Sequence, residues 1–122
     1  MIKTLNSTAP HIAKASTWSE DLVDWGEHLI PIDGKSSNVG RLLFKGADDG
    51  LPEAGIWDCS PGSWRLELPR DELCHFVSGH ATYRRDDGEI TEVTPGTVVH
   101  FHEGWNGIVT VHETTRAIYM LR

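Results

Sequence analysis

The sequence predicts an all-β fold, either a sandwich or a barrel of short strands. From residue 39 onward, short runs of strand-forming residues alternate with turn residues such as Pro61-Gly62 and Pro95-Gly96. Asp87-Gly88 stands between two of these runs, and an Asp-Gly step in that position is a strong hairpin signal. No segment has the length and periodicity of a long helix.

The expected strands cover residues 39–44, 55–59, 64–68, 72–78, 80–85, 89–93, 97–102, 107–112 and 116–121. In 64–68, large and polar residues alternate, which is typical of a half-buried strand. Trp64, Leu66 and Leu68 share one face, so we expect them to line the interior. In 97–102, Val99 and Phe101 take the core face. The pair His100 and His102 is therefore expected on the outer face.

The first 38 residues differ in texture from the rest. They are predicted to form an irregular N-terminal arm, 1–38, while residues 39–122 form the barrel domain. Thr17 and Glu20 stand at capping-box spacing and allow at most one or two helical turns. Trp18 and Trp25 are large apolar side chains that need burial. We expect the arm to pack on the barrel or on a dimer partner.

Composition excludes several classes of function. A chain of 122 residues suits one domain. Its net charge of −7 disfavours binding to nucleic acid, which requires clustered Lys and Arg. No apolar run approaches the roughly 18 residues of a membrane helix, and two cysteines are too few for a disulfide framework. A cytoplasmic protein without membrane or nucleic-acid partners is expected.

Residues 55–122 resemble the cupin superfamily, and within it the subfamily named for its similarity to (S)-ureidoglycine aminohydrolase. Glu72 followed by Gly79 resembles the end of the first cupin motif. Pro95-Gly96-Thr97 leading through VVHFHEGW resembles the second. The resemblance implies a double-stranded β-helix, which is a jelly-roll barrel open at the end where ligands bind. It also implies a homodimer.

The sequence departs from the family in its metal ligands. Cupins of this kind bind a metal through His-x-His, one glutamate and a later histidine, and these positions fall at Leu68, Arg70, Glu72 and Gly107. One carboxylate cannot hold a transition metal that needs three or four ligands. We therefore expect no metal in the usual cupin position. A divalent metal is possible only through a non-standard site that recruits His100 or His102.

Glu72 is the leading candidate for a ligand-binding residue. Arg70 has the same parity and could replace the metal's positive charge or bind a carboxylate, although it could equally point into solvent. Apolar residues complete the expected pocket, and Cys74 is interpreted as a small buried hydrophobe rather than a nucleophile. Trp64 could also be plain core. The predicted pocket residues are Glu72, Arg70, Trp64, Leu68, Cys74 and Trp105.

Three functions are compatible with these residues. The first is binding of a small polar or carboxylate-bearing metabolite in the barrel mouth without a metal. The second is a metal-dependent enzyme of the ureidoglycine aminohydrolase-like type, and the third is a structural or regulatory dimer with a filled barrel. The missing histidines favour the first, while the second rests on resemblance alone.

Overall fold

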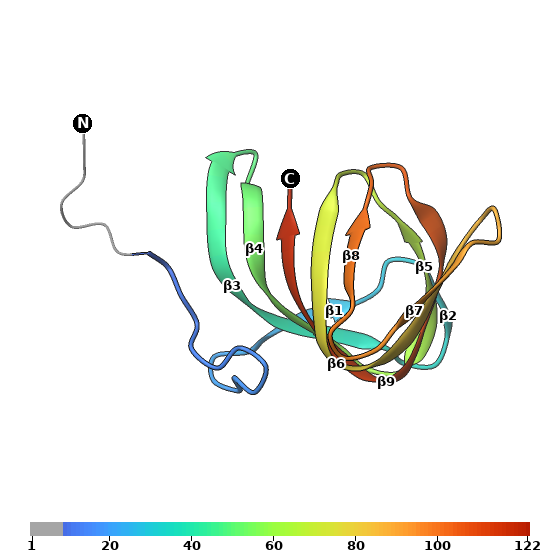
Figure 1. The fold of residues 1–122 in the computed structure, drawn as a ribbon, viewed down its shortest axis with the longest axis horizontal. Helices are drawn as coiled ribbons and strands as arrows, with labels where there is room; N and C mark the ends of the chain where they lie inside the picture. The colour runs from blue at the N-terminus through green and yellow to red at the C-terminus, as the bar shows by residue number, and fades with distance from the viewer. Residues whose placement is uncertain (1–8) are drawn as a thin grey trace.

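The computed structural model describes residues 9–122, and these form one curled antiparallel sheet of nine strands (Figure 1). The described residues contain no helix, which confirms the all-β prediction. Consequently, none of the described segments is an apolar helix able to cross a membrane. The strands are β1 (Val23–Glu27), β2 (Pro31–Asp33), β3 (Ser37–Asp48), β4 (Leu51–Cys59), β5 (Gly62–Glu67), β6 (Glu72–Arg85), β7 (Ile90–Val93), β8 (Val98–Phe101) and β9 (Asn106–Leu121).

Strand β9 is the centre of the sheet. Its first half pairs with β5, its second half pairs with β4, and nearly its whole length pairs with β6. Strand β6 in turn pairs with β8 through its first residues and with β7 through its last. Because β6 and β9 both bend, the sheet closes on itself and produces a jelly roll with an inner and an outer face (Figure 1).

The bend in β6 depends on Gly79. The register between β6 and β9 shifts between Phe76 and Ala81, and Gly79 adopts a φ of 91° within this segment. A Cβ atom at Gly79 would lie 2.2 Å from the carbonyl oxygen of Thr114. The sequence predicted that one strand ends at this glycine, whereas the structure places a bulge there inside one long strand. The runs 107–112 and 116–121 are likewise joined in β9.

The predicted hairpin at Asp87-Gly88 is present. Ala81 to Arg84 of β6 pair with Val93 to Ile90 of β7, and Gly88 has a φ of 98°. That left-handed conformation is the one for which glycine is favoured in tight hairpins.

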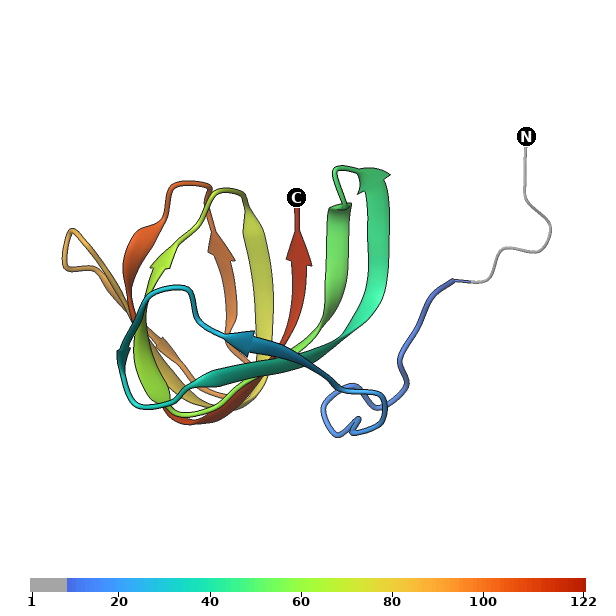
Figure 2. The ribbon, with the colours of Figure 1, turned by 180° about the vertical axis from the view of Figure 1, so that it is seen from behind.

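The second half of the arm is more regular than predicted. β1 pairs with β3, and β2 pairs with β5, so residues 23–33 cross over the curled sheet (Figure 2). The predicted boundary between residues 38 and 39 falls inside β3. Residues 13–17 form a turn, and the helical turns expected near Thr17 are absent from the described residues. The part of the predicted arm that covers residues 1–8 lies outside the described residues.

The core lies between the curled faces of the sheet. Its fully buried side chains include Phe76, Val93 and Val109, and the aromatic residues Tyr83, Phe101 and Trp105 pack on one another beside them. Tyr83 and Phe101 also line the cavity described next.

Candidate functional site

A cavity of about 210 Å³ opens at the end of the jelly roll where β9 finishes. Glu53 at the start of β4, Glu72 at the start of β6 and Leu121 at the end of β9 stand side by side in the sheet register. The C-terminal end of β9 marks this rim in Figure 1. The lining consists of Trp25, Glu53, Trp57, Trp64, Leu66, Glu72, Tyr83, Phe101, Tyr119 and Leu121.

Glu72 lies on the inner face, between Phe101 of β8 and Leu121 of β9. Burial raises the pKa of its carboxyl above the usual range, and the nearby charge of Glu53 acts in the same direction. The Cys74 thiol donates a hydrogen bond to Glu72 Oε2 at 3.2 Å, which partly offsets the effect of burial. Glu72 is therefore a carboxyl that retains its proton to a higher pH than an exposed glutamate.

A second carboxyl, that of Glu53, stands on the other side of Leu121 from Glu72. The Tyr119 hydroxyl donates a hydrogen bond to Glu53 Oε2 at 2.6 Å, and Lys45 Nζ approaches Glu53 Oε1 at 3.8 Å from outside the lining. Burial is the main reason why the pKa of Tyr119 is raised, so its phenol remains a donor. Among the described residues, 9–122, no Lys, Arg or His lines the cavity.

Aromatic side chains make most of the wall. Trp57 and Trp64 meet edge to face with their ring centroids 6.3 Å apart, and Trp25 packs against Tyr119 in the same way. The ring of His28 stacks on Trp64 from outside the cavity at 3.8 Å. Burial lowers the pKa of His28 to about 4, so this imidazole is neutral at neutral pH. The wall is apolar and electron-rich.

The structure brings together some of the predicted pocket residues. Glu72 and Trp64 line the cavity, and Cys74 lies directly behind Glu72 with 1% of its surface exposed. Arg70 lies in the loop between β5 and β6 and is not part of the lining. Leu68 and Trp105 are buried in the adjacent core, also outside the lining.

Several lining residues were not named by the sequence interpretation, among them Trp25, Glu53, Tyr83 and Tyr119. Glu53 shares parity with Trp57, so a strand extended two residues toward the N-terminus would have placed both on one face. Tyr119 and Leu121 are two residues apart in β9, so alternation places both side chains on one face. Trp25 carried no positional signal, because it stands in a strand whose residues are mostly exposed.

The residues at the usual cupin metal positions do not fit a metal. Leu68 has no donor atom, and Arg70 carries a positive charge. Gly107 is tightly enclosed, because a Cβ atom there would lie 2.2 Å from the carbonyl oxygen of Arg84 and 2.7 Å from the Trp105 ring. A histidine could not replace it without movement of the backbone. Glu72 is left without co-ligands from this set.

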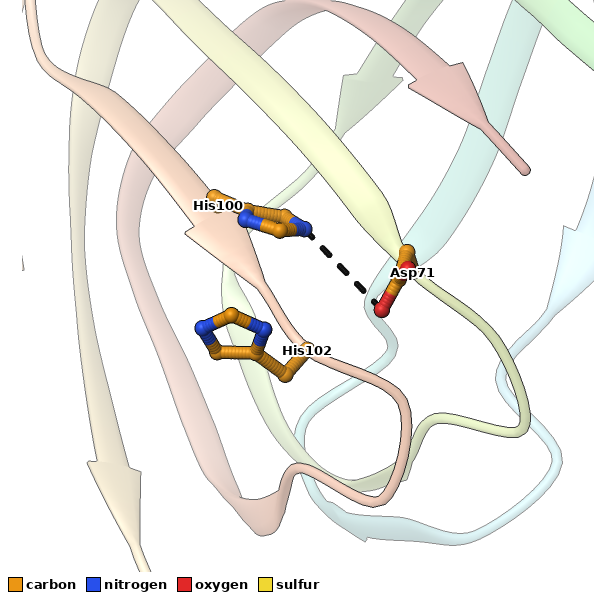
Figure 3. Close-up of side chains that lie close together, drawn as sticks. All are labelled: Asp71, His100 and His102. Carbon is orange, nitrogen blue, oxygen red and sulfur yellow. Dashed lines mark ion pairs between the residues drawn. The ribbon is translucent and has the colours of Figure 1, made fainter.

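Three potential metal ligands do converge on the outer face. His100 and His102 point outward from β8 and its end, as the alternation predicted, and Asp71 precedes β6 (Figure 3). Their ligand atoms all lie within 4.8 Å of one another. Within residues 9–122, these three side chains form the group whose spacing could hold a metal ion. The pKa of Asp71 is lowered, chiefly because the backbone N–H of Glu103 donates to its carboxylate.

A cysteine and a histidine also meet behind the cavity, but they do not form a nucleophilic pair. Cys59 Sγ lies 3.4 Å from His28 Nε2, and Ser36 Oγ contacts both atoms. Cys59 has no exposed surface, and burial raises its pKa to about 11. A thiol that is both neutral and inaccessible cannot attack a substrate.

The fold is similar to that of several solved structures of low sequence identity. The Clostridium difficile EutQ protein matches with a TM-score of 0.60 and 17% identity, over 70% of this chain and 68% of that one. An ectoine synthase from P. lautus matches with a TM-score of 0.62 and 17% identity, over 75% and 67% of the two chains. These likenesses show the fold alone.

A protein of unknown function from Pseudomonas syringae pv. tomato has a TM-score of 0.75 and 19% identity. The match covers 83% of this chain but 44% of that protein. No curated protein matches the chain. The family model described as the EutQ-like cupin domain matches residues 46–119, which is more than half of the sequence. The chain therefore belongs to the EutQ-like cupin domain family, a coarser placement than the aminohydrolase-like subfamily expected from the sequence.

Proposed function

We propose that this protein binds a small molecule in the Glu72 cavity and does so without a metal. The observation that carries the proposal is a buried carboxyl inside an aromatic wall, with no cationic side chain among the described residues that line it. Small-ligand sites are commonly built in this way, from an apolar cavity with a few polar groups that orient the ligand.

The charges of the lining favour a particular class of ligand. A carboxylate ligand was expected to pair with Arg70, but Arg70 does not line the cavity, and Glu53 and Glu72 would repel an anion. An ammonium group, by contrast, would offset the cost of ionising the buried Glu72 carboxyl, form an ion pair with it and contact the faces of Trp57 and Trp64. We infer a compact ligand with an apolar body and an ammonium or other hydrogen-bond-donating end.

The proposal is tested by titrating the protein with three probes of similar shape: benzylamine, benzyl alcohol and benzoate. We expect calorimetry to rank benzylamine first and benzoate last. The substitution Glu72→Gln should weaken benzylamine about tenfold, as expected for loss of a charge-assisted hydrogen bond, and leave benzyl alcohol nearly unchanged. The matched control is Glu113→Gln, on an exposed part of β9.

Two results would contradict the proposal. If none of the three probes binds, the cavity is not a site for compact aromatic ligands of this kind. If benzoate binds as tightly as benzylamine, or if Glu72→Gln and Glu113→Gln behave alike, Glu72 does not select the ligand.

The two other functions receive less support. An enzyme of the ureidoglycine aminohydrolase-like type would need a metal at the family position, where Leu68, Arg70 and Gly107 provide no ligands. A filled barrel is difficult to reconcile with a cavity of about 210 Å³ beside Glu72. No observation specifically favours either function.

A further inference from the structure

We propose that His100, His102 and Asp71 bind a divalent zinc-class metal ion on the outer face of the jelly roll (Figure 3). This inference is independent of the cavity, because the three side chains lie on the opposite face of β6 and β8 from Glu72. Nothing in the proposed ligand-binding function requires the metal.

The register of the sheet explains why the three residues meet. Leu73 pairs with His100, and Glu72 pairs with Phe101. Continuing the same register by one residue sets Asp71 opposite His102, diagonally next to His100. Since side chains alternate between faces, Asp71, Leu73, His100 and His102 share the outer face. The arrangement follows from a regular antiparallel pair and needs no unusual backbone.

The distances are close to those of a metal site. His100 Nε2 lies 3.9 Å from Asp71 Oδ1, and the two imidazole rings are 4.3 Å apart between centroids. Two ligand atoms bound to one zinc ion at about 2.1 Å stand roughly 3.4 Å apart in tetrahedral geometry. The site therefore closes with a small adjustment of side chains. The His100 side chain is 48% exposed and is free to make that adjustment.

The carboxylate is oriented toward the two imidazoles. The backbone N–H of Glu103 donates to Asp71 Oδ1 at 2.8 Å, and Arg122 Nη2 approaches Asp71 Oδ2 at 3.3 Å. Such outer contacts fix the direction of a metal-binding carboxylate. Arg122 is 82% exposed in its side chain, so it can withdraw when a cation binds.

The donor set defines the class of metal. Two imidazoles and one carboxylate suit zinc and neighbouring first-row ions, and not calcium or magnesium, which prefer oxygen ligands alone. Both histidines also border a surface hollow of about 380 Å³, which leaves room for water to complete the coordination. Two carboxylates, Glu89 and Glu103, and one guanidinium, Arg85, line the same hollow, so its local charge favours a cation.

The test is calorimetric titration of the folded full-length protein with Zn²⁺. We expect one Zn²⁺ per chain, and we expect His102→Ala and Asp71→Asn each to weaken binding by at least about tenfold. The matched control is His75→Ala, because His75 is an exposed histidine on the outer face of β6 outside the cluster. Replacement of Zn²⁺ by Co²⁺ should give the visible absorption of a nitrogen- and oxygen-ligated ion in the wild type and lose it in His102→Ala.

A second pair of histidines provides the decisive comparison. His80 and His112 have ring centroids 4.5 Å apart, and His80 Nε2 contacts Glu92. If the double substitution His80→Ala and His112→Ala abolishes Zn²⁺ binding, or if His102→Ala leaves it unchanged, the proposal is wrong. Failure of the wild type to bind Zn²⁺ would also overturn it. None of these outcomes bears on whether the Glu72 cavity binds benzylamine, benzyl alcohol or benzoate.

Discussion

The Glu72 carboxyl is the residue through which the cavity responds to pH. Its pKa in the folded protein is raised above 4.5, mainly by burial. The folded state therefore holds this proton to a higher pH than the unfolded chain does. The contribution of Glu72 to stability is complete below pH 4.5 and decreases as the pH rises through the raised pKa.

We predict that Glu72→Gln removes the loss of stability that accompanies ionisation of Glu72 as the pH rises. Relative to the wild type, the variant should become progressively more stable as the pH rises from 4.5 through the raised pKa of Glu72. The free energy of unfolding, measured in urea at several pH values, gives the comparison, with Glu113→Gln as the control. A difference between wild type and Glu72→Gln that does not change with pH would show that Glu72 ionises normally.

Sequence reasoning located this residue but not its partners. Glu72 was predicted from its place in the cupin motif, which is a local signal. The contacts of Glu72 with Leu121 and of Glu53 with Tyr119 depend on how β9 lies beside β4 and β6. Asp71 was missed for a similar reason, since its proximity to His100 is visible only once the register of β6 and β8 is known.

At the level of elements, β4 and β9 are joined by an ion pair that the sequence did not reveal. Arg116 Nε and Nη2 donate to the two carboxylate oxygens of Asp58 at 2.7 and 2.9 Å, and Nη1 donates to the Ala15 carbonyl at 2.9 Å. Arg116 has 8% of its surface exposed. The pair thus connects two strands and the arm in a largely dry environment.

We predict that Arg116→Met destabilises the protein by about 3 kcal/mol, because it leaves a poorly solvated Asp58 without its partner. Urea denaturation of Arg116→Met and of Arg84→Met, an exposed arginine on β6, provides the measurement and its control. Equal stability of the two variants would mean that the pair contributes little. The double variant Arg116→Met with Asp58→Leu should recover part of the loss.

The strands that were predicted well are those with a clear period of two. β8 alternates between exposed and more buried residues, β5 buries Trp64, and the bounds of both strands were placed within two residues. β1 was missed because its pattern is mostly exposed and has no alternation. Gly79 was misread because a glycine that ends a strand and a glycine that permits a bulge have the same local sequence signal.

At the level of the whole molecule, residues 23–33 complete the jelly roll. Trp25 closes the cavity wall, and a Cβ atom at Gly40 would lie 2.3 Å from its ring, so the indole packs directly on β3. His28 covers Trp64 on the other side. These contacts suggest that the arm contributes to the stability of the barrel and is not an appendage.

We predict that deletion of residues 1–30 lowers the midpoint of thermal unfolding and the solubility. Trp25→Ala should reproduce part of the effect, whereas Leu29→Ala should not, because Leu29 is fully exposed. Light scattering on the same samples gives the molar mass in solution. It therefore tests the homodimer that the cupin resemblance implies and shows whether the dimer persists in the truncated chain. A truncated protein as stable and soluble as the intact one would refute this role of the arm.

The central position of β9 has a consequence for synthesis of the chain. β9 follows β4, β5 and β6 in the sequence and pairs with all three. While translation is still short of residue 106, each of these strands has an open edge that β9 will later occupy. Such edges can pair with other chains. The ribosome must therefore release residues 106–121 before the sheet can close, so a nascent chain that pauses earlier is a substrate for aggregation or for chaperones.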